Sequence, residues 1–192
     1  MSIAIKCVDW NAARYDQVYN YELAIKLLLE EIEELFEAKS LVDTLDAIGD
    51  ITFVAMGVLW KLGCTKEEIH AFFYATDLRI LTSYELHDHM NYILEHVIHR
   101  AKEDDYGTIP GAYLACSAVF VTCFAKLRSL NMQGCFYAIV DAICESNNTK
   151  EVKGKTDAAV KANIVKGASY VPPTQVLLEI AQAYVHVIPE RY

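Results

Sequence analysis

The sequence has few residues that interrupt helices. Four prolines and eight glycines occur among its 192 residues. Up to about residue 150, apolar residues recur every three or four positions, with little strict alternation of apolar and polar residues. Both observations argue against a β-sheet architecture. They predict an all-α protein, an antiparallel helical bundle built as a single domain over residues 1–192.

Basic residues are also scarce. The chain has 17 Lys and Arg against 26 Asp and Glu, which gives a net charge of −9. No basic stripe is visible that would match a nucleic-acid backbone or an anionic membrane surface, so we expect neither as a partner. A free nucleotide remains compatible with this charge, because a metal ion can bridge carboxylates and phosphates.

Long hydrophobic runs and closely paired cysteines are absent too. The most apolar run, residues 112–125, is too short to span a membrane, and residues 1–10 lack the pattern of a secretory signal. The six cysteines have no close-paired spacing, and several lie in apolar helical stretches. This favours reduced core thiols over zinc ligands or disulfides. We therefore expect a cytoplasmic protein without a transmembrane helix.

Several segments have helical periodicity, and we expect helices at residues 15–39, 44–62, 66–80, 84–102, 110–130 and 133–146. From Asn147 to Val171 the chain is polar, bears lysines and contains glycine, which predicts a long loop over the bundle that could close on a ligand. A last helix should begin at Pro172 and Pro173, since proline suits a first helical turn.

A weak internal repeat relates residues 51–69 to residues 119–137, a shift of 68 positions. If it is real, residues 15–83 form an active half and residues 84–148 a degenerate half, followed by a substrate-covering loop and helix at 149–192. The second half would keep the helices but lose the acids. Two unrelated amphipathic helix pairs would align about as well, so both interpretations stay open.

Carboxylates are abundant in the first half of the proposed repeat, residues 15–83. In residues 27–38, LLLEEIEELFEA, an advance of about 100° per residue places Leu28, Ile32, Leu35 and Phe36 on one apolar arc. Glu33 and Glu37 point to solvent and Glu30 and Glu34 lie at the edge of the arc. Glu31 falls within the arc, where an ionised carboxylate needs a partner.

The next helix carries a second set of acids. Asp43, Asp46 and Asp50 lie on one stripe through spacings of three and four, and Asp50 is flanked there by Ala47, Val54 and Gly57. A short connection makes the two helices antiparallel neighbours, so their acids can converge. Hard carboxylate oxygens suit Mg²⁺, with Mn²⁺ as an alternative, although a bare acidic helix face is more often simply solvated.

These residues resemble the all-α nucleoside triphosphate pyrophosphohydrolases, the MazG-like superfamily that includes phosphoribosyl-ATP pyrophosphohydrolase and the dimeric dUTPases. Glu30, Glu31 and Glu34 match the family's EExxE pattern, and Asp50 matches the last acid of its ExxD pattern. Residues 145–150, ESNNTK, and 161–173, KANIVKGASYVPP, resemble a second family block. The chain departs from the pattern at Ala47, where the family has an acid, and in the length between the two blocks.

The resemblance implies a metal-dependent hydrolysis of a nucleoside triphosphate to the monophosphate and pyrophosphate, in nucleotide-pool housekeeping. Glu31, Glu34, Asp50 and, in place of the missing acid, Asp46 would bind the metal, and Glu30 would orient or deprotonate the attacking water. Lys150 and Lys166 would contact phosphates, and Asn147 the sugar or base. Tyr170 or Trp10 would stack on the base. The chain would form a homodimer or imitate the family dimer within one chain.

Other interpretations remain. His87, His89, His96 and His99 cluster in one predicted helix and are typical of surface or interface histidines, because no glutamate stands three residues before any of them as in di-iron bundles. A ferritin-like metal oxidase would need inward glutamates on four helices. A non-catalytic nucleotide-binding or scaffold protein that keeps the fold is the main alternative, and Ala47 permits it.

Overall fold

The computed structural model describes residues 2–75, 109–152 and 164–185, and these are mostly helical. The α-helices are α1 (Ile3–Ala12), α2 (Tyr21–Glu37), α3 (Leu41–Lys61), α4 (Lys66–Ala75), α6 (Ile109–Ser129), α7 (Phe136–Asn148) and α8 (Thr174–Val185). A short 3-10 helix, η2 (Gln133–Cys135), precedes α7, and strands β1 (Glu151–Val152) and β2 (Ile164–Val165) follow it. The predicted all-α class is confirmed for this part of the chain.

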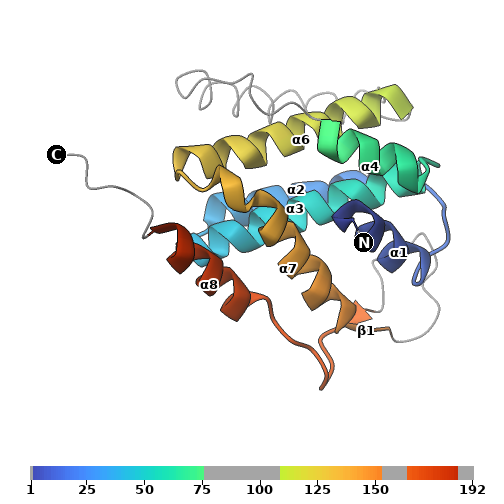
Figure 1. Ribbon diagram of the computed structural model, residues 1–192. Coiled ribbons are helices and arrows are strands. Elements are labelled where there is room, and N and C mark those ends of the chain that lie inside the picture. The colour runs from blue at the N-terminus through green and yellow to red at the C-terminus, as the bar shows by residue number, and fades with distance from the viewer. Residues whose placement is uncertain (1, 76–108, 153–163, 186–192) are drawn as a thin grey trace.

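Helix α3 is the centre of the fold. It packs against α1, α2, α4, α6, α7 and α8, and Figure 1 shows it lying between α2, α6 and α7. Most of its residues are buried, including the fully buried Leu45, Ile48, Met56 and Leu59. Gly49 lets α7 approach closely, because a Cβ there would overlap the Ile143 side chain. The residue next to Asp50 is therefore fixed against α7.

Helices α2 and α3 form the expected hairpin. The Asn20 side chain caps α2 by accepting from Leu23 N at 3.0 Å. Ser40 and Asp43 form a reciprocal capping box at the start of α3, which orders the short connection, residues 38–40. Leu28, Ile32 and Leu35 of α2 are buried as predicted, and Glu33 and Glu37 are exposed. Phe36, predicted on the same apolar arc, is 59% exposed and lies in the last turn of α2.

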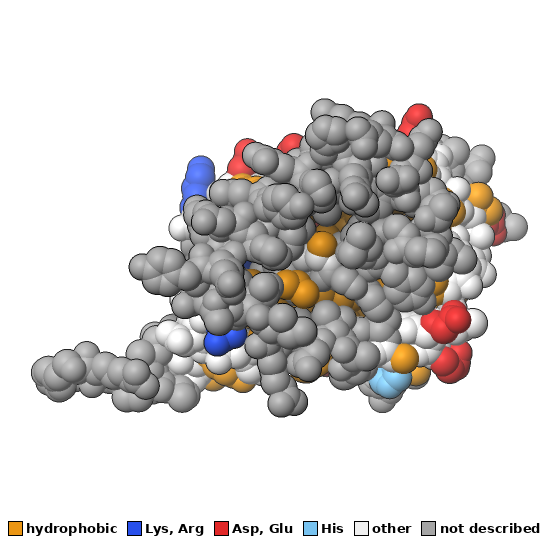
Figure 2. Space-filling model, turned by 90° about the horizontal axis from the view of Figure 1, so that it is seen from above, with side chains coloured by type: hydrophobic (Ala, Val, Ile, Leu, Met, Phe, Trp, Pro, Cys, Tyr) orange, Lys and Arg blue, Asp and Glu red, His pale blue; other side chains and the backbone are white. Residues whose placement is uncertain are grey.

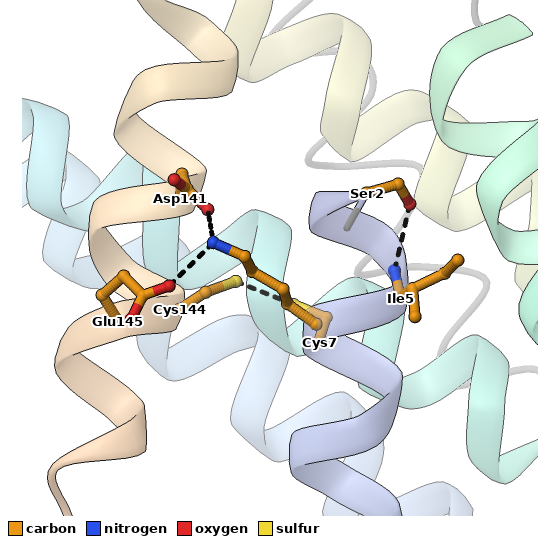
Figure 3. Close-up of polar contacts among 7 residues, drawn as sticks. Ser2, Ile5, Cys7, Asp141, Cys144 and Glu145 are labelled. Atoms are coloured by element: carbon orange, nitrogen blue, oxygen red, sulfur yellow. Dashed lines mark hydrogen bonds and ion pairs between the residues drawn. The ribbon is translucent and has the colours of Figure 1, made fainter.

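Helix α1 was not predicted. Ser2 caps it by accepting from Ile5 N at 3.3 Å, and the helix buries Ala4, Cys7 and Val8. It is held to α7 by Lys6, whose Nζ donates to Asp141 Oδ1 at 2.6 Å and to Glu145 Oε1 at 2.7 Å. Figure 3 shows both acids reaching from α7 toward α1 beside Cys7 and Cys144. Those two sulfurs lie 3.5 Å apart, and all six cysteines are buried and free, as predicted.

The segment predicted as a loop contains a small β-ladder. Strands β1 and β2 are antiparallel, with Glu151 opposite Val165 and Val152 opposite Ile164. The prediction missed this because two-residue strands give no periodic signal. Thr149 fastens the ladder to α7, since its Oγ1 donates to Ser146 O at 2.7 Å and accepts from Val171 N at 2.8 Å.

Some predictions fall outside the described residues. The helix expected at 84–102, the end of the one expected at 66–80, and His87, His89, His96 and His99 belong to this group. Helices α3 and α6 both have 21 residues and begin 68 positions apart, at residues 41 and 109. This offset equals the shift of the proposed repeat, of whose second half residues 84–108 lie outside the described residues. No helix in the described ranges has the length and apolarity that crossing a membrane requires.

Candidate functional site

A cavity of about 270 Å³ lies between α1, α2, α3, the C-terminal end of α7 and the β-ladder. One wall follows α3, where Asp50, Phe53, Gly57 and Lys61 occur on successive turns. With a rise of 1.5 Å per residue, Asp50 and Lys61 stand about 16 Å apart along the helix. The cavity is therefore elongated, with a different chemistry at each end.

The opposite wall runs along α2 in the reverse direction. Glu31, Leu27, Ala24 and Asn20 line it in that order, again about one turn apart. Because the helices form a hairpin, Glu31 lies near Asp50 and Asn20 near Lys61. Two carboxylates predicted from helical periodicity therefore meet at one end of the same cavity.

Burial disfavours the ionised form of these carboxylates and raises their pKa values. Desolvation, together with the nearby charges of Asp50 and Glu34, raises the pKa of Glu31 to about 8. Desolvation, with the charges of Asp46 and Glu34, raises the pKa of Asp50 to about 7, against the opposing influence of Lys150 and Lys166. Acids with pKa values this far above their ordinary range are typical of functional sites.

The other predicted acids lie around this pair. Burial raises the pKa of Asp46, opposed by Lys166, and its Oδ1 is buried without a hydrogen-bond partner among the described residues. Glu34 is exposed, yet its charge reaches Glu31, Asp46 and Asp50. Glu30 pairs with Lys26 at 3.9 Å and does not line the cavity.

Two lysines face the carboxylates across the cavity. Lys150 precedes β1 and Lys166 follows β2, so continuing the antiparallel register places them opposite each other. Both line the cavity. At Gly167 the Glu151 carboxylate occupies the place of a Cβ, which favours glycine next to Lys166. The β-ladder therefore brings together two lysines that lie 16 positions apart in the sequence.

Asn147 lines the cavity beside these lysines, and Trp10 connects this part of the lining to the aromatic part. Asn147 is 3% exposed and lies at the end of α7, and its carbonyl oxygen accepts from Trp10 Nε1 at 2.8 Å. Tyr170, predicted to stack on a base, does not line the cavity. Its ring instead lies 5.1 Å from Lys166 Nζ, where it can hold that lysine in place.

The far end of the cavity is aromatic. Trp10 contacts Tyr15 and Phe53, with ring centroids 5.9 and 5.1 Å away. Lys61 Nζ lies 4.5 Å from the centre of the Tyr15 ring. Asn11 also lines the cavity at this end, beside Gly57.

Sequence reasoning missed Asn11, Tyr15, Asn20 and Lys61 as lining residues. One signal was available, since Asn11 stands four positions after Cys7 and three after Val8. It is therefore a polar residue on the apolar face of a helix that had not been recognised.

The acids offer a donor set that suits a hard divalent cation, and the unpartnered Asp46 oxygen fits such a ligand role. As the side chains stand, no three His, Cys, Asp or Glu residues in the described ranges are gathered closely enough to hold a metal ion. The expected four-ligand cluster is therefore not preassembled. Binding a cation there would require the acids to draw closer together.

Comparisons with protein-family models, with curated proteins and with solved structures found no match for this chain.

Proposed function

We propose that this protein is a Mg²⁺-dependent nucleoside triphosphate pyrophosphohydrolase. The supporting observation is one elongated cavity in which two desolvated carboxylates, Glu31 and Asp50, face two lysines, Lys150 and Lys166, while aromatic rings line the other end. A nucleotide has the same polarity, with an anionic chain at one end and a flat, stackable base at the other. The resemblance to the MazG-like superfamily points to the same reaction.

The lysines would bind the phosphate chain. Each ammonium group acts as a compact positive charge, and the β-ladder holds the two on one side of the cavity. The overall charge of the protein is −9, so these lysines and a cation are needed to offset the repulsion between acids and phosphates.

Glu31, Glu34, Asp46 and Asp50 would hold the cation. When bound, a divalent ion supplies charge that stabilises the developing negative charge on the phosphates. It would also stabilise the ionised forms of Glu31 and Asp50, which desolvation disfavours. Glu30 stands beside Glu31 and remains our candidate to orient or deprotonate the attacking water, a role that requires it to turn from Lys26.

A second candidate is a nucleotide-binding protein without turnover. Ala47 favours it, because this buried alanine stands where the family pattern has an acid. The absence of a preassembled group of three ligands in the described residues points the same way. Such a protein would bind nucleotides through the same lysines and aromatic rings.

The two candidates differ in pyrophosphate release. We would supply a panel of ribo- and deoxynucleoside triphosphates with Mg²⁺ and compare the wild type with Glu31→Gln and Asp50→Asn. Glu33→Gln is a matched control, because Glu33 lies on the same helix but is exposed. We expect at least a hundredfold loss in both site variants and none in the control. Nucleotide binding without turnover would establish the second candidate. The absence of both binding and turnover would refute both candidates.

A further inference from the structure

Two polar side chains in the aromatic part of the cavity offer a hydrogen-bond acceptor and a donor that are not paired with each other. They are the side-chain oxygen of Asn11 on α1 and the ammonium group of Lys61 on α3. Neither is used in binding phosphate or metal in the proposed function, on which this inference rests.

Asn11 has its amide orientation fixed. Its Nδ2 donates to Cys7 O at 2.9 Å, and since that carbonyl can only accept, the nitrogen must face it. The Oδ1 then lies beside Gly57, 3.0 Å from where a Cβ would stand. The side chain is 5% exposed. Within the described residues no group donates to Oδ1, so it can accept from a ligand.

Lys61 lies one turn further along α3. It is four residues after Gly57, so the two positions lie on the same face of the helix. Its Nζ lies over the Tyr15 ring at 4.5 Å and has no carboxylate within ion-pair distance in the described ranges. Burial lowers its pKa, which marks an ammonium group removed from water. Lysine has donors only, so it requires an acceptor on the ligand.

A planar ring stacked among Trp10, Tyr15 and Phe53 would therefore meet a donor from Lys61 and an acceptor from Asn11, which lie beside neighbouring turns of α3. The matching ligand edge has a carbonyl oxygen next to a ring N–H. Uracil, thymine and guanine have this edge, whereas cytosine and adenine have an amino group and an unprotonated ring nitrogen there, which reverses the polarity. The geometry points to Lys61 and Asn11 as specificity-determining residues that select nucleotides with oxo bases over those with amino bases.

The test is calorimetric titration of the full chain with dUMP, dCMP, dGMP and dAMP. The dUMP and dCMP bases differ at this edge alone. We expect dUMP and dGMP to bind about tenfold more tightly than dCMP and dAMP. Lys61→Met, which keeps the apolar stem, should reduce the difference to within twofold. Lys39→Met is the matched control, since Lys39 is exposed and lies away from the cavity lining, and should keep the preference.

Similar affinities for dUMP and dCMP in the wild type would overturn the inference, as would a preference retained by Lys61→Met or no binding of any monophosphate. The wild-type comparison decides the matter even if a variant fails to fold. Pyrophosphate release without base preference would remove this inference and leave the proposed function standing. Base-selective binding without pyrophosphate release would support the base selection by Lys61 and Asn11 and refute the proposed pyrophosphohydrolase activity.

Discussion

At the residue scale, Asp50 is central to the site because its half-buried carboxylate lines the cavity between α2, α3 and the β-ladder. Its pKa of about 7 means that at pH 8 the folded protein holds a charge that burial disfavours. Neighbouring Asp46 and Glu34 add repulsion, which Lys150 and Lys166 offset only in part. Ionised Asp50 therefore destabilises the metal-free fold.

We predict that Asp50→Asn stabilises the metal-free protein at pH 8. The amide has the same shape and no charge, so the free energy of unfolding should rise by about 1–2 kcal/mol. Thermal unfolding in the presence of a chelator measures this. The control is the same comparison at pH 5, where Asp50 is already protonated and the gain should largely vanish. A destabilised variant at pH 8 would mean that Lys150 and Lys166 compensate the charge fully.

Helical periodicity identified Glu31 and Asp50 because a carboxylate on an apolar arc is visible in the sequence alone. The same argument failed for Phe36, since periodicity shows which face is apolar but not how far the neighbouring helix extends. It could not find Lys61 as a cavity residue either. Its position over Tyr15 depends on a segment between α1 and α2 that has no periodic pattern.

At the scale of elements, the β-ladder depends on Thr149. This hydroxyl joins the end of α7 to residue 171 through two hydrogen bonds and stands next to Lys150. The Ser146 hydroxyl reinforces the junction by donating to Val171 O at 2.8 Å. The position of the lysines is therefore set by backbone contacts that the hydroxyl maintains.

We predict that Thr149→Val weakens triphosphate binding more than it affects folding. Loss of both hydrogen bonds should cost about 1–2 kcal/mol of stability and raise the KM for the triphosphate severalfold with little change in kcat. Steady-state kinetics and thermal unfolding measure the two effects. Thr149→Ser keeps the hydroxyl and should behave as the wild type. An unchanged KM in the valine variant would show that the lysines are positioned in another way.

Most helices could be predicted from the sequence, because α2, α3, α4 and α6 each bury an apolar face with regular spacing. Helix α1 was missed because it has ten residues and is stabilised by contacts with α7, such as those of Lys6, rather than by a strong pattern of its own. The β-ladder was missed because it too is stabilised by contacts between distant segments rather than by a local pattern. Its register is a long-range property, and only the motif resemblance suggested that Lys150 and Lys166 act together.

At the scale of the whole molecule, the acids that line the cavity differ from the paired acids at the surface in having no ion pair among the described residues. On the face shown in Figure 2, basic side chains lie apart from one another and acidic side chains lie along the edges. Two acids at the surface, Asp141 and Glu145, pair with Lys6. Glu31 and Asp50 have no such ion pair in the described ranges, so they dominate the pH dependence near neutrality.

We predict that the metal-free protein loses stability as the pH rises from 5 to 8.5. The pKa values of Glu31 and Asp50 rise from ordinary values of 4.5 and 3.8 to about 8 and 7 on folding. The folded state thus holds protons that the unfolded state has lost. Stability from these protons is complete below about pH 4 and is lost as the pH passes through 7 and 8. One pKa unit corresponds to about 1.4 kcal/mol, and solvent screening of these half-buried groups reduces the sum, so we expect a loss of at least about 2 kcal/mol, or at least about 4–8 °C in Tm.

Addition of Mg²⁺ should reverse this loss at pH 8.5 but have little effect at pH 5, where protons occupy the carboxylates. Thermal unfolding at both pH values, with and without Mg²⁺, measures the effect. Asp50→Asn provides the control and should show a smaller response to both pH and Mg²⁺. A rise in stability between pH 5 and 8.5 without metal would contradict the assignment of these acids as the groups that titrate.

The contacts between α1 and α7 also constrain the order in which the protein assembles during synthesis. Lys6, Cys7 and Trp10 contact partners 135 to 139 positions later in the chain. During synthesis α1 leaves the ribosome well before α7, although α3 and α4, against which it also packs, emerge earlier than α7. Until α7 emerges, the apolar side chains of Ala4, Cys7 and Val8 have no partner on it. The contacts between α1 and α7 therefore form late, and a ribosome-bound chain that ends before α7 would lack Asn147, Lys150 and Lys166 and so a complete binding site.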